Sequence, residues 1–152
     1  MTEGPQESTG DRQTLDQRRA AHAWDTVEEV ESLAKAKDFV GHAKKLPMRI
    51  RAAGLGQALA FVASKGTLGS EKREAPNPAL KTLMLRLNDW VLDQRKLRGT
   101  TGRDDPQALL REINGRDAAF LKRATMETMG WLQWVNRFAE AKGLKGEDDG
   151  GE

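Results

Sequence analysis

Residues 46–66 read LPMRIRAAGLGQALAFVASKG, and this stretch decides the kind of fold that the chain forms. Five of its apolar residues line one face of an α-helix; they are Ile50, Leu55, Ala58, Leu59 and Val62. Pro47 is predicted as the first helical residue, where its missing N–H costs nothing. Gly54 and Gly56 allow two interpretations, a break in the helix or a close approach of two backbones. The stretch is therefore expected to be helical and buried along one side.

Helical periodicity continues on both sides of this stretch. Upstream, Thr14 and Gln17 have the form of a capping box, and the apolar pattern predicts a helix to about residue 37, resuming through residues 39–43. Downstream, we expect helices over residues 79–97, about 106–114 and 117–142, separated by loops at 66–78 and 99–105. Asp105 and Asp117 are predicted to cap the last two helices, and Gly143 to end the final one.

Nothing in the chain alternates as a half-buried strand does. The predicted fold class is therefore all-α, a compact helical bundle of about five or six helices. We divide the chain into a disordered tail at residues 1–13, a single helical domain at 14–143 and an acidic tail at 144–152.

Composition limits the classes of protein to which the chain can belong. Its 152 residues, 38% of them hydrophobic, are enough for one core, and the mean hydropathy is −0.69. No apolar run is long enough to cross a bilayer, and the N-terminus lacks the pattern of a secretion signal. Cysteine is absent, which excludes disulfides and thiolate chemistry. We expect a cytoplasmic protein.

Positive charge is concentrated in the middle of the chain. The net charge is only +2, but residues 41–103 hold thirteen basic and four acidic residues. A basic middle favours a surface that meets a polyanion such as nucleic acid. Charge alone fits equally well with basic side chains that only solvate helix surfaces.

Few residues suit catalysis or metal binding. The two histidines, His22 and His42, are 20 residues apart, and Asp38 with His42 has no third ligand nearby. The Gly-Leu-Gly at 54–56 lacks the following Lys-Ser or Lys-Thr of a phosphate loop. We therefore expect no enzyme, no metal, no cofactor and no small-molecule substrate.

The four tryptophans divide into two pairs. Trp24 and Trp131 lie on apolar stripes and are expected in the core. Trp90 and Trp134 lie at or beyond the stripe edges, so we predict that they anchor a partner subunit. Stacking on nucleic-acid bases is the alternative role for such aromatic side chains.

Two segments resemble the small subunit of the type III-B CRISPR Cmr complex. The first contains Leu46-Pro47, Ile50-Arg51, Gly54-Leu55, Ala58-Leu59-Ala60-Phe61 and Ser64-Lys65 in the family's spacing. The second, WLQWVNRFAEA at 131–141, is similar to the family's terminal helix through Trp134, Arg137 and Phe138-Ala139. The pattern Ala20-Ala21-Ala23-Trp24 also fits. The resemblance covers about residues 15–142, and the chain departs from it in its acidic ends and its lack of Tyr.

This resemblance implies a helical subunit without catalytic residues of its own. Several copies would stack along a ribonucleoprotein filament used in antiviral defence and clamp both RNAs. Other Cmr subunits would carry the CRISPR RNA and cut the target RNA. The implied partners are those subunits, further copies of this chain, and both RNAs, with no membrane.

The predicted RNA-binding residues are Lys44, Lys45, Arg49, Arg51, Lys65 and Arg137. Phosphate contacts by such side chains need no sequence preference, which suits a subunit that accepts any guide. On a continuous helix Arg51 and Lys65 share a side but Arg49 does not, so one patch requires a bend near Gly54. Two alternatives stay open: a scaffold whose basic residues pair only with protein, and a DNA-binding helix-turn-helix regulator.

Overall fold

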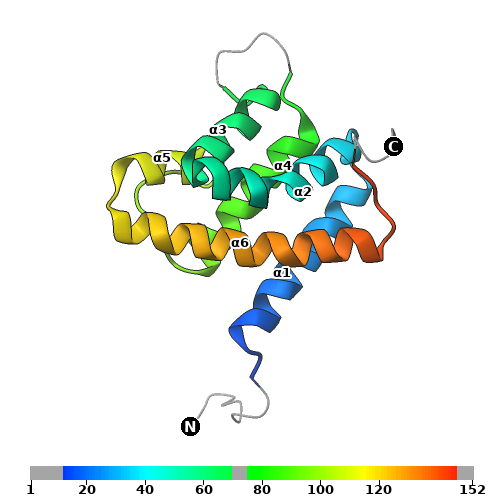
Figure 1. The fold of residues 1–152 in the computed structure, drawn as a ribbon, viewed down its shortest axis with the longest axis horizontal. Coiled ribbons are helices and arrows are strands. Elements are labelled where there is room, and N and C mark those ends of the chain that lie inside the picture. The colour runs from blue at the N-terminus through cyan, green and yellow to red at the C-terminus, as the bar shows by residue number, and fades with distance from the viewer. Residues whose placement is uncertain (1–11, 70–74, 147–152) are drawn as a thin grey trace.

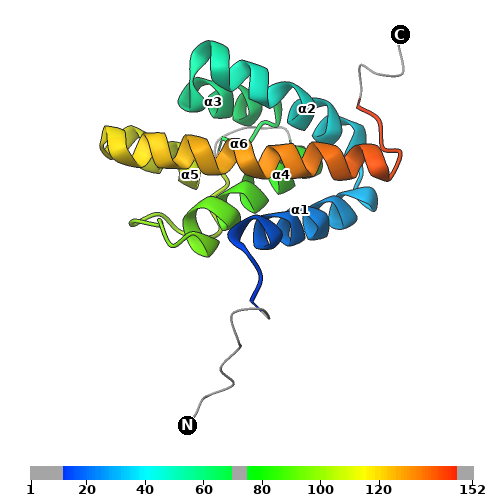
Figure 2. The ribbon, with the colours of Figure 1, turned by 60° about the horizontal axis from the view of Figure 1, so that its bottom comes forward.

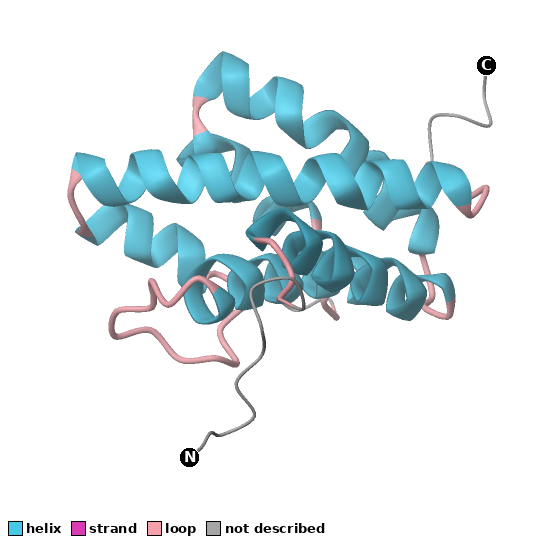
Figure 3. Cartoon of the chain, turned by 90° about the horizontal axis from the view of Figure 1, so that it is seen from below, coloured by secondary structure: helices cyan, strands magenta, loops and turns pink. Residues whose placement is uncertain are grey.

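The computed structural model describes residues 12–69 and 75–146. Six α-helices and one π-helical segment make up the fold: α1 (Leu15–Glu31), α2 (Ala36–Ala53), α3 (Leu55–Lys65), α4 (Pro78–Asn88), η2 (Asp89–Gln94), α5 (Ala108–Gly115) and α6 (Ala118–Ala141). Figure 3 shows helices and loops, without a strand, in this part of the chain. The predicted all-α class is confirmed. Most of the two predicted tails, residues 1–11 and 147–152, lies outside the described residues.

The helices pack around α4 and α6 (Figures 1 and 2). The longest helix, α6, packs against α1, α2 and η2, with α2 running antiparallel beside it. Figure 2 shows α1 on one side of α6 and α2 with α3 on the other. Behind α6, α4 contacts α1, α2 and α3, and its Leu80, Leu83, Met84 and Leu87 are almost fully buried.

The capping box that starts α1 is present as predicted. Thr14 Oγ1 accepts from the Gln17 N–H at 3.0 Å, and the Gln17 side chain accepts from the Thr14 N–H at 2.7 Å. The helix ends at Glu31, earlier than the predicted residue 37. Lys35 adopts a left-handed conformation with φ 63°, which ends the turn between the helices and lets α2 start at Ala36.

Pro47 lies inside α2 and not at the start of a helix, so the predicted boundary there is wrong. A proline inside a helix leaves the carbonyl four residues earlier without its N–H donor. That carbonyl belongs to Ala43, and it accepts a hydrogen bond from Asn136 Nδ2 of α6 at 2.9 Å. The helix therefore continues through Pro47 because a distant helix supplies the missing donor.

Gly54 breaks the helix, which decides between the two interpretations of the glycines. It has φ 92° and ψ 160°, and it is the single residue between α2 and α3. A residue with a Cβ is strained at this positive φ. The junction is shorter than the three- or four-residue turn of a helix-turn-helix motif.

The helix predicted at 79–97 is α4 followed by the wider turns of η2. Asn77 caps α4 through its side-chain oxygen, which accepts from the Ala79 and Leu80 N–H groups. Asp117 caps α6 as predicted, accepting from the Phe120 N–H at 3.0 Å, and Gly143 follows the helix end with φ 75°. The predicted cap at Asp105 is wrong: α5 starts at Ala108 with Gln107 as its N-cap, and Asp105 instead accepts from the Gln107 N–H at 2.9 Å in the turn before the helix.

The core contains the predicted apolar stripes of α1, α2, α3, α4 and α6, including Val27, Ile50, Leu59, Leu83 and Val135. Trp131 is fully buried, as expected, and Trp24 is half-buried against Phe138, at 5.0 Å between ring centroids. Among the described residues, every helix is too short or too polar to cross a membrane.

Candidate nucleic-acid interface

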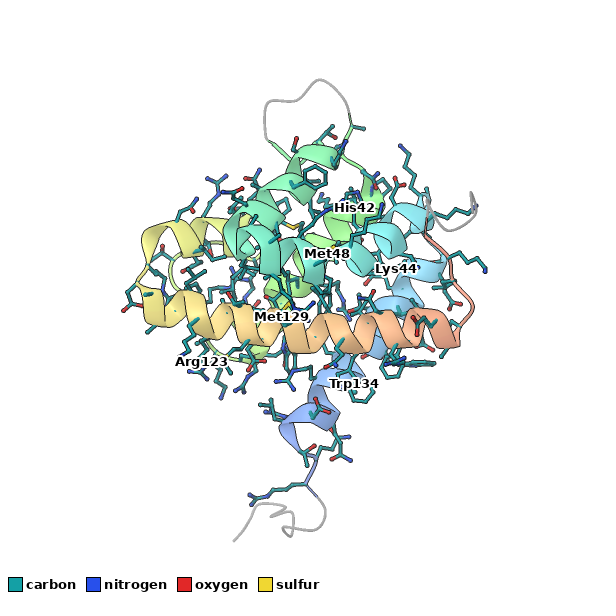
Figure 4. The ribbon with its side chains drawn as sticks, in the orientation of Figure 1. His42, Lys44, Met48, Arg123, Met129 and Trp134 are labelled. Carbon is teal, nitrogen blue, oxygen red and sulfur yellow. The ribbon has the colours of Figure 1, made fainter. Side chains whose placement is uncertain are left out.

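Four of the six predicted RNA-binding residues lie on the outer side of α2. At about 100° per residue, Lys44 and Arg51 point within about 20° of each other, and Lys45 and Arg49 within about 40°. Between these two rows lies Met48, whose side chain is 73% exposed. Figure 4 shows Lys44 and Met48 on α2, with Met129 on the neighbouring α6. The row of Lys44 and Arg51 faces α6, and the row of Lys45 and Arg49 faces α3.

The row that faces α3 meets an exposed aromatic ring. The guanidinium carbon of Arg49 lies 4.4 Å from the centroid of the Phe61 ring, and Lys65 Nζ lies 5.5 Å from it. The His42 ring lies 6.0 Å from the same centroid. We call His42, Arg49, Phe61 and Lys65 the Phe61 cluster. The bend at Gly54 turns α3 against α2, which brings Lys65 to the side of α2 that carries Arg49.

His42 is the neutral member of the Phe61 cluster. Burial lowers the pKa of His42 below its usual value, the charge of Arg49 lowers it further, and the opposing effect of Asp38 does not compensate. The neutral ring accepts a hydrogen bond at Nδ1 from Arg49 Nη1 at 3.4 Å. The guanidinium of Arg49 is thus held by His42 and Phe61 together.

The row that faces α6 borders a groove of about 330 Å³. Arg51 and Pro47 line it from α2, while Gln133, Asn136 and Arg137 line it from α6. Arg137 forms an exposed pair with Glu140 at 3.4 Å. Exposed pairs of this kind are weak, so a phosphate can compete for Arg137.

The six predicted residues thus lie on one surface that extends over α3, α2 and α6, which we call the basic face. Lys44, Lys45, Arg51, Lys65 and Arg137 are exposed, and Arg49 is half-buried. Phe61 and Met48 are surface residues that were not predicted. Phe61 lies about 200° from the buried Leu59 on the helix and outside the predicted apolar stripe, and that offset could have indicated its exposure. Met48 lies about 200° from the buried Ile50 on the helix, and that offset could have indicated it.

The prediction for Trp90 as a subunit anchor is wrong. Trp90 is only 2% exposed, and its indole N–H donates to Glu127 Oε1 of α6 at 3.1 Å. Its neighbour Asp89 suggested a stripe edge, but the wider turns of η2 direct Trp90 inward, where a buried carboxylate accepts its N–H.

Trp134 stays a candidate for an interface. It is half-buried, stacks on Phe138 with ring centroids 5.3 Å apart, and donates its N–H to Asp16 Oδ1 at 3.0 Å. The Trp134 bond, together with one from Arg19, holds the pKa of the Asp16 carboxyl below its usual value. Figure 4 shows Trp134 on the side of α6 away from α2.

The structure brings together no metal-binding cluster in the part of the chain that it describes. Asp38, which shares α2 with His42, accepts a hydrogen bond from Asn77 Nδ2 at 2.8 Å. Its carboxylate therefore fixes the start of α4 to α2.

Comparison with known proteins agrees with this fold. The family model described as CRISPR-associated protein (Cas_Cmr5) matches residues 15–142. The crystal structure of a CRISPR-associated Cmr5 family protein from Thermus thermophilus is similar, with a TM-score of 0.63 and 28% sequence identity. That match covers 86% of this chain and 97% of the other. No curated protein sequence matches the chain. Because the family match extends from α1 to the end of α6, the chain belongs to the Cmr5 family, the small subunits of the type III-B CRISPR Cmr complex.

Proposed function

We propose that this subunit contributes no catalytic group to its complex and clamps RNA through the basic face. The observation that carries the proposal is the convergence of cations from three helices on one surface, through the Phe61 cluster and the groove between α2 and α6. Cations that neutralise phosphates release counterions, which gives affinity without sequence preference. Such contacts suit the CRISPR RNA and any target RNA paired with it.

The buried titratable groups support a structural role. Burial raises the pKa of Glu127, but hydrogen bonds from Arg95 and Arg19 outweigh this effect and leave the pKa below its usual value. Burial also raises the pKa of Glu112, and bonds from the Thr101 hydroxyl and Arg116 outweigh it in the same way. Both carboxylates are thus ionised and their oxygens are used in contacts between parts of the fold. A general acid must instead hold a proton that it can donate.

The partners that follow from the proposal are other Cmr subunits and further copies of this chain stacked along the filament, in a cytoplasmic antiviral complex. Trp134 and Met48 are the apolar side chains that we assign to contacts with those partners. Aromatic and methionine side chains are enriched in such interfaces.

The test is a pair of double charge reversals in the reconstituted complex. Arg49→Glu with Lys65→Glu alters the Phe61 cluster, and Arg51→Glu with Arg137→Glu alters the groove. Each is expected to weaken target-RNA binding roughly tenfold or more at moderate salt and to make the dependence of log Kd on log salt shallower by about one to two. The measurement is Kd across a salt series.

The matched control reverses Lys122 and Arg123, which are exposed near the start of α6, and Figure 4 shows Arg123 on the side away from α2. This variant has the same charge change and should bind RNA as the unmodified subunit does. If complexes that contain the basic-face variants bind target RNA with normal affinity and salt dependence, the RNA-clamping role is wrong. If the variants fail to join the complex, the basic residues contact protein instead.

A further inference from the structure

Phe61 is the aromatic side chain that the fold leaves exposed among the residues that the structure describes. Its side chain is 39% exposed, whereas Trp90, Trp131, Phe39 and Phe120 are buried. Arg49, Lys65 and His42 surround the ring, and part of it is open to solvent. A ligand that carries negative charge and a flat surface fits these surroundings.

The contacts around Phe61 form the protein side of a candidate stacking site, an aromatic ring with two cations beside it. Arg49 lies over the ring at 4.4 Å from its centroid and is also held by Nδ1 of His42 at 3.4 Å. A guanidinium fixed in this way offers a flat cationic surface, and its remaining N–H groups can reach a phosphate. Lys65 Nζ, 5.5 Å from the same centroid, adds a second cation beside the ring.

We propose that the Phe61 cluster is a binding site for an unpaired nucleotide. The base stacks against the Phe61–Arg49 pair, and Lys65 neutralises the adjoining phosphate. This inference rests on the proposed RNA-clamping function and adds a preference to it. Bases stack on aromatic rings and on guanidinium planes whatever their identity, so the site accepts any base.

The preference is for unpaired RNA, since the base faces within a duplex are already covered by their neighbours. A surface that binds only phosphates would distinguish unpaired RNA from duplex RNA only through their different charge densities. A nucleotide that is unstacked from a guide–target duplex, or a single-stranded segment beside it, is the ligand that this site fits.

The test uses the full chain with a short single-stranded RNA that carries 2-aminopurine, a base whose fluorescence is quenched on stacking. The Phe61→Leu variant keeps apolar bulk but removes the aromatic face, and Phe61→Trp restores one. Phe61→Leu is expected to weaken binding roughly five- to tenfold and to reduce the quenching. The salt dependence should be unchanged, because no phosphate contact is removed, and Phe61→Trp should recover both signals.

Duplex RNA of the same sequence is the control ligand, and Phe61→Leu should weaken its binding clearly less than binding of the single strand, because a duplex offers no unpaired base to stack. Circular dichroism and thermal unfolding of the Leu variant show whether its fold is retained. The inference is overturned if Phe61→Leu binds and quenches normally, or if it weakens single-stranded and duplex RNA equally. The charge-reversal variants distinguish the stacking site from the RNA-clamping function. If Phe61→Leu binds RNA normally while the Arg49→Glu, Lys65→Glu variant binds weakly, the clamping function stands and the stacking site is wrong.

Discussion

His22 is fixed in one protonation state by two hydrogen bonds from opposite sides. The Trp131 indole N–H donates to His22 Nδ1 at 2.9 Å, and His22 Nε2 lies 2.8 Å from Asp89 Oδ2. Because indole is a donor only, Nδ1 must be the acceptor and Nε2 carries the proton. Burial lowers the pKa of His22 below 6.5, although the bond to Asp89 opposes this shift.

This arrangement predicts a loss of stability in mild acid. The unfolded chain binds a proton at His22 more readily than the folded chain does, so the stabilisation is complete above the usual pKa near 6.5 and is lost as pH falls through the lower folded value. A proton on Nδ1 would also face the Trp131 N–H. Between about pH 8 and pH 5, we expect the free energy of unfolding to fall by about 1 kcal/mol from this residue.

The measurement is denaturant unfolding at a series of pH values. His22→Gln should flatten the curve in this range, while His42→Gln controls for the second histidine, whose pKa is also lowered. The carboxylates with a lowered pKa, Asp16, Glu112 and Glu127, lose their contribution only as pH falls below about 4.5, outside this window. An equally steep curve in His22→Gln would contradict the assignment.

At the scale of elements, α2 and α6 depend on each other at Pro47. The Ala43 carbonyl would be a buried acceptor without a donor if Asn136 were removed. We expect Asn136→Ala to lower the free energy of unfolding by about 1–2 kcal/mol. In a Pro47→Ala background the helix itself supplies the N–H, so the effect of the same Asn136→Ala change should be smaller.

A double-mutant cycle over these two positions measures the coupling directly by denaturant unfolding. Asn114→Ala is a matched control, because Asn114 is exposed at the end of α5 and the change should have little effect. Additive effects of Pro47→Ala and Asn136→Ala would show that the Asn136 side chain does not compensate for the proline.

At the scale of the whole molecule, Glu127 joins three parts of the chain that are distant in sequence. From α6 it accepts hydrogen bonds from Arg19 of α1 at 3.1 Å, Trp90 of η2 at 3.1 Å and Arg95 after η2 at 3.0 Å. Gly130, one turn along α6, leaves room for Arg19, since a Cβ there would lie 2.9 Å from Arg19 Nε. These contacts fix α1 and η2 to the same side of α6.

Glu127→Gln should therefore destabilise the entire fold. The change leaves Arg19 and Arg95 partly buried beside a neutral amide, and breaking a buried ion pair in this way costs about 3 kcal/mol. The free energy of unfolding is the quantity to measure. Glu140→Gln makes the same change on α6 at an exposed pair with Arg137 and should cost less than about 1 kcal/mol. Similar losses for the two variants would show that the Glu127 contacts add little.

The helices and their caps could be predicted from the sequence because they depend on neighbours within a few residues. The Thr14–Gln17 box, the Asp117 cap and the end of α6 at Gly143 are local hydrogen bonds and dihedral preferences. The apolar stripes predicted the buried faces for the same reason, and the spacing of residues 46–66 with residues 131–141 indicated the family. The six basic residues of the candidate site were also predicted, although RNA contact by them is still a prediction.

Only the tertiary structure decided how those helices meet. Pro47 continues a helix because Asn136, 93 residues from Ala43 in the chain, satisfies the Ala43 carbonyl, and Trp90 is buried because Glu127 of another helix accepts its N–H. Arg49, Phe61 and Lys65 form one cluster because the chain bends at Gly54. The sequence thus determined the helical class, most of the helices, their buried stripes and the family. Contacts between residues that are distant in sequence determined the shape of the basic face, and local sequence patterns do not report such contacts.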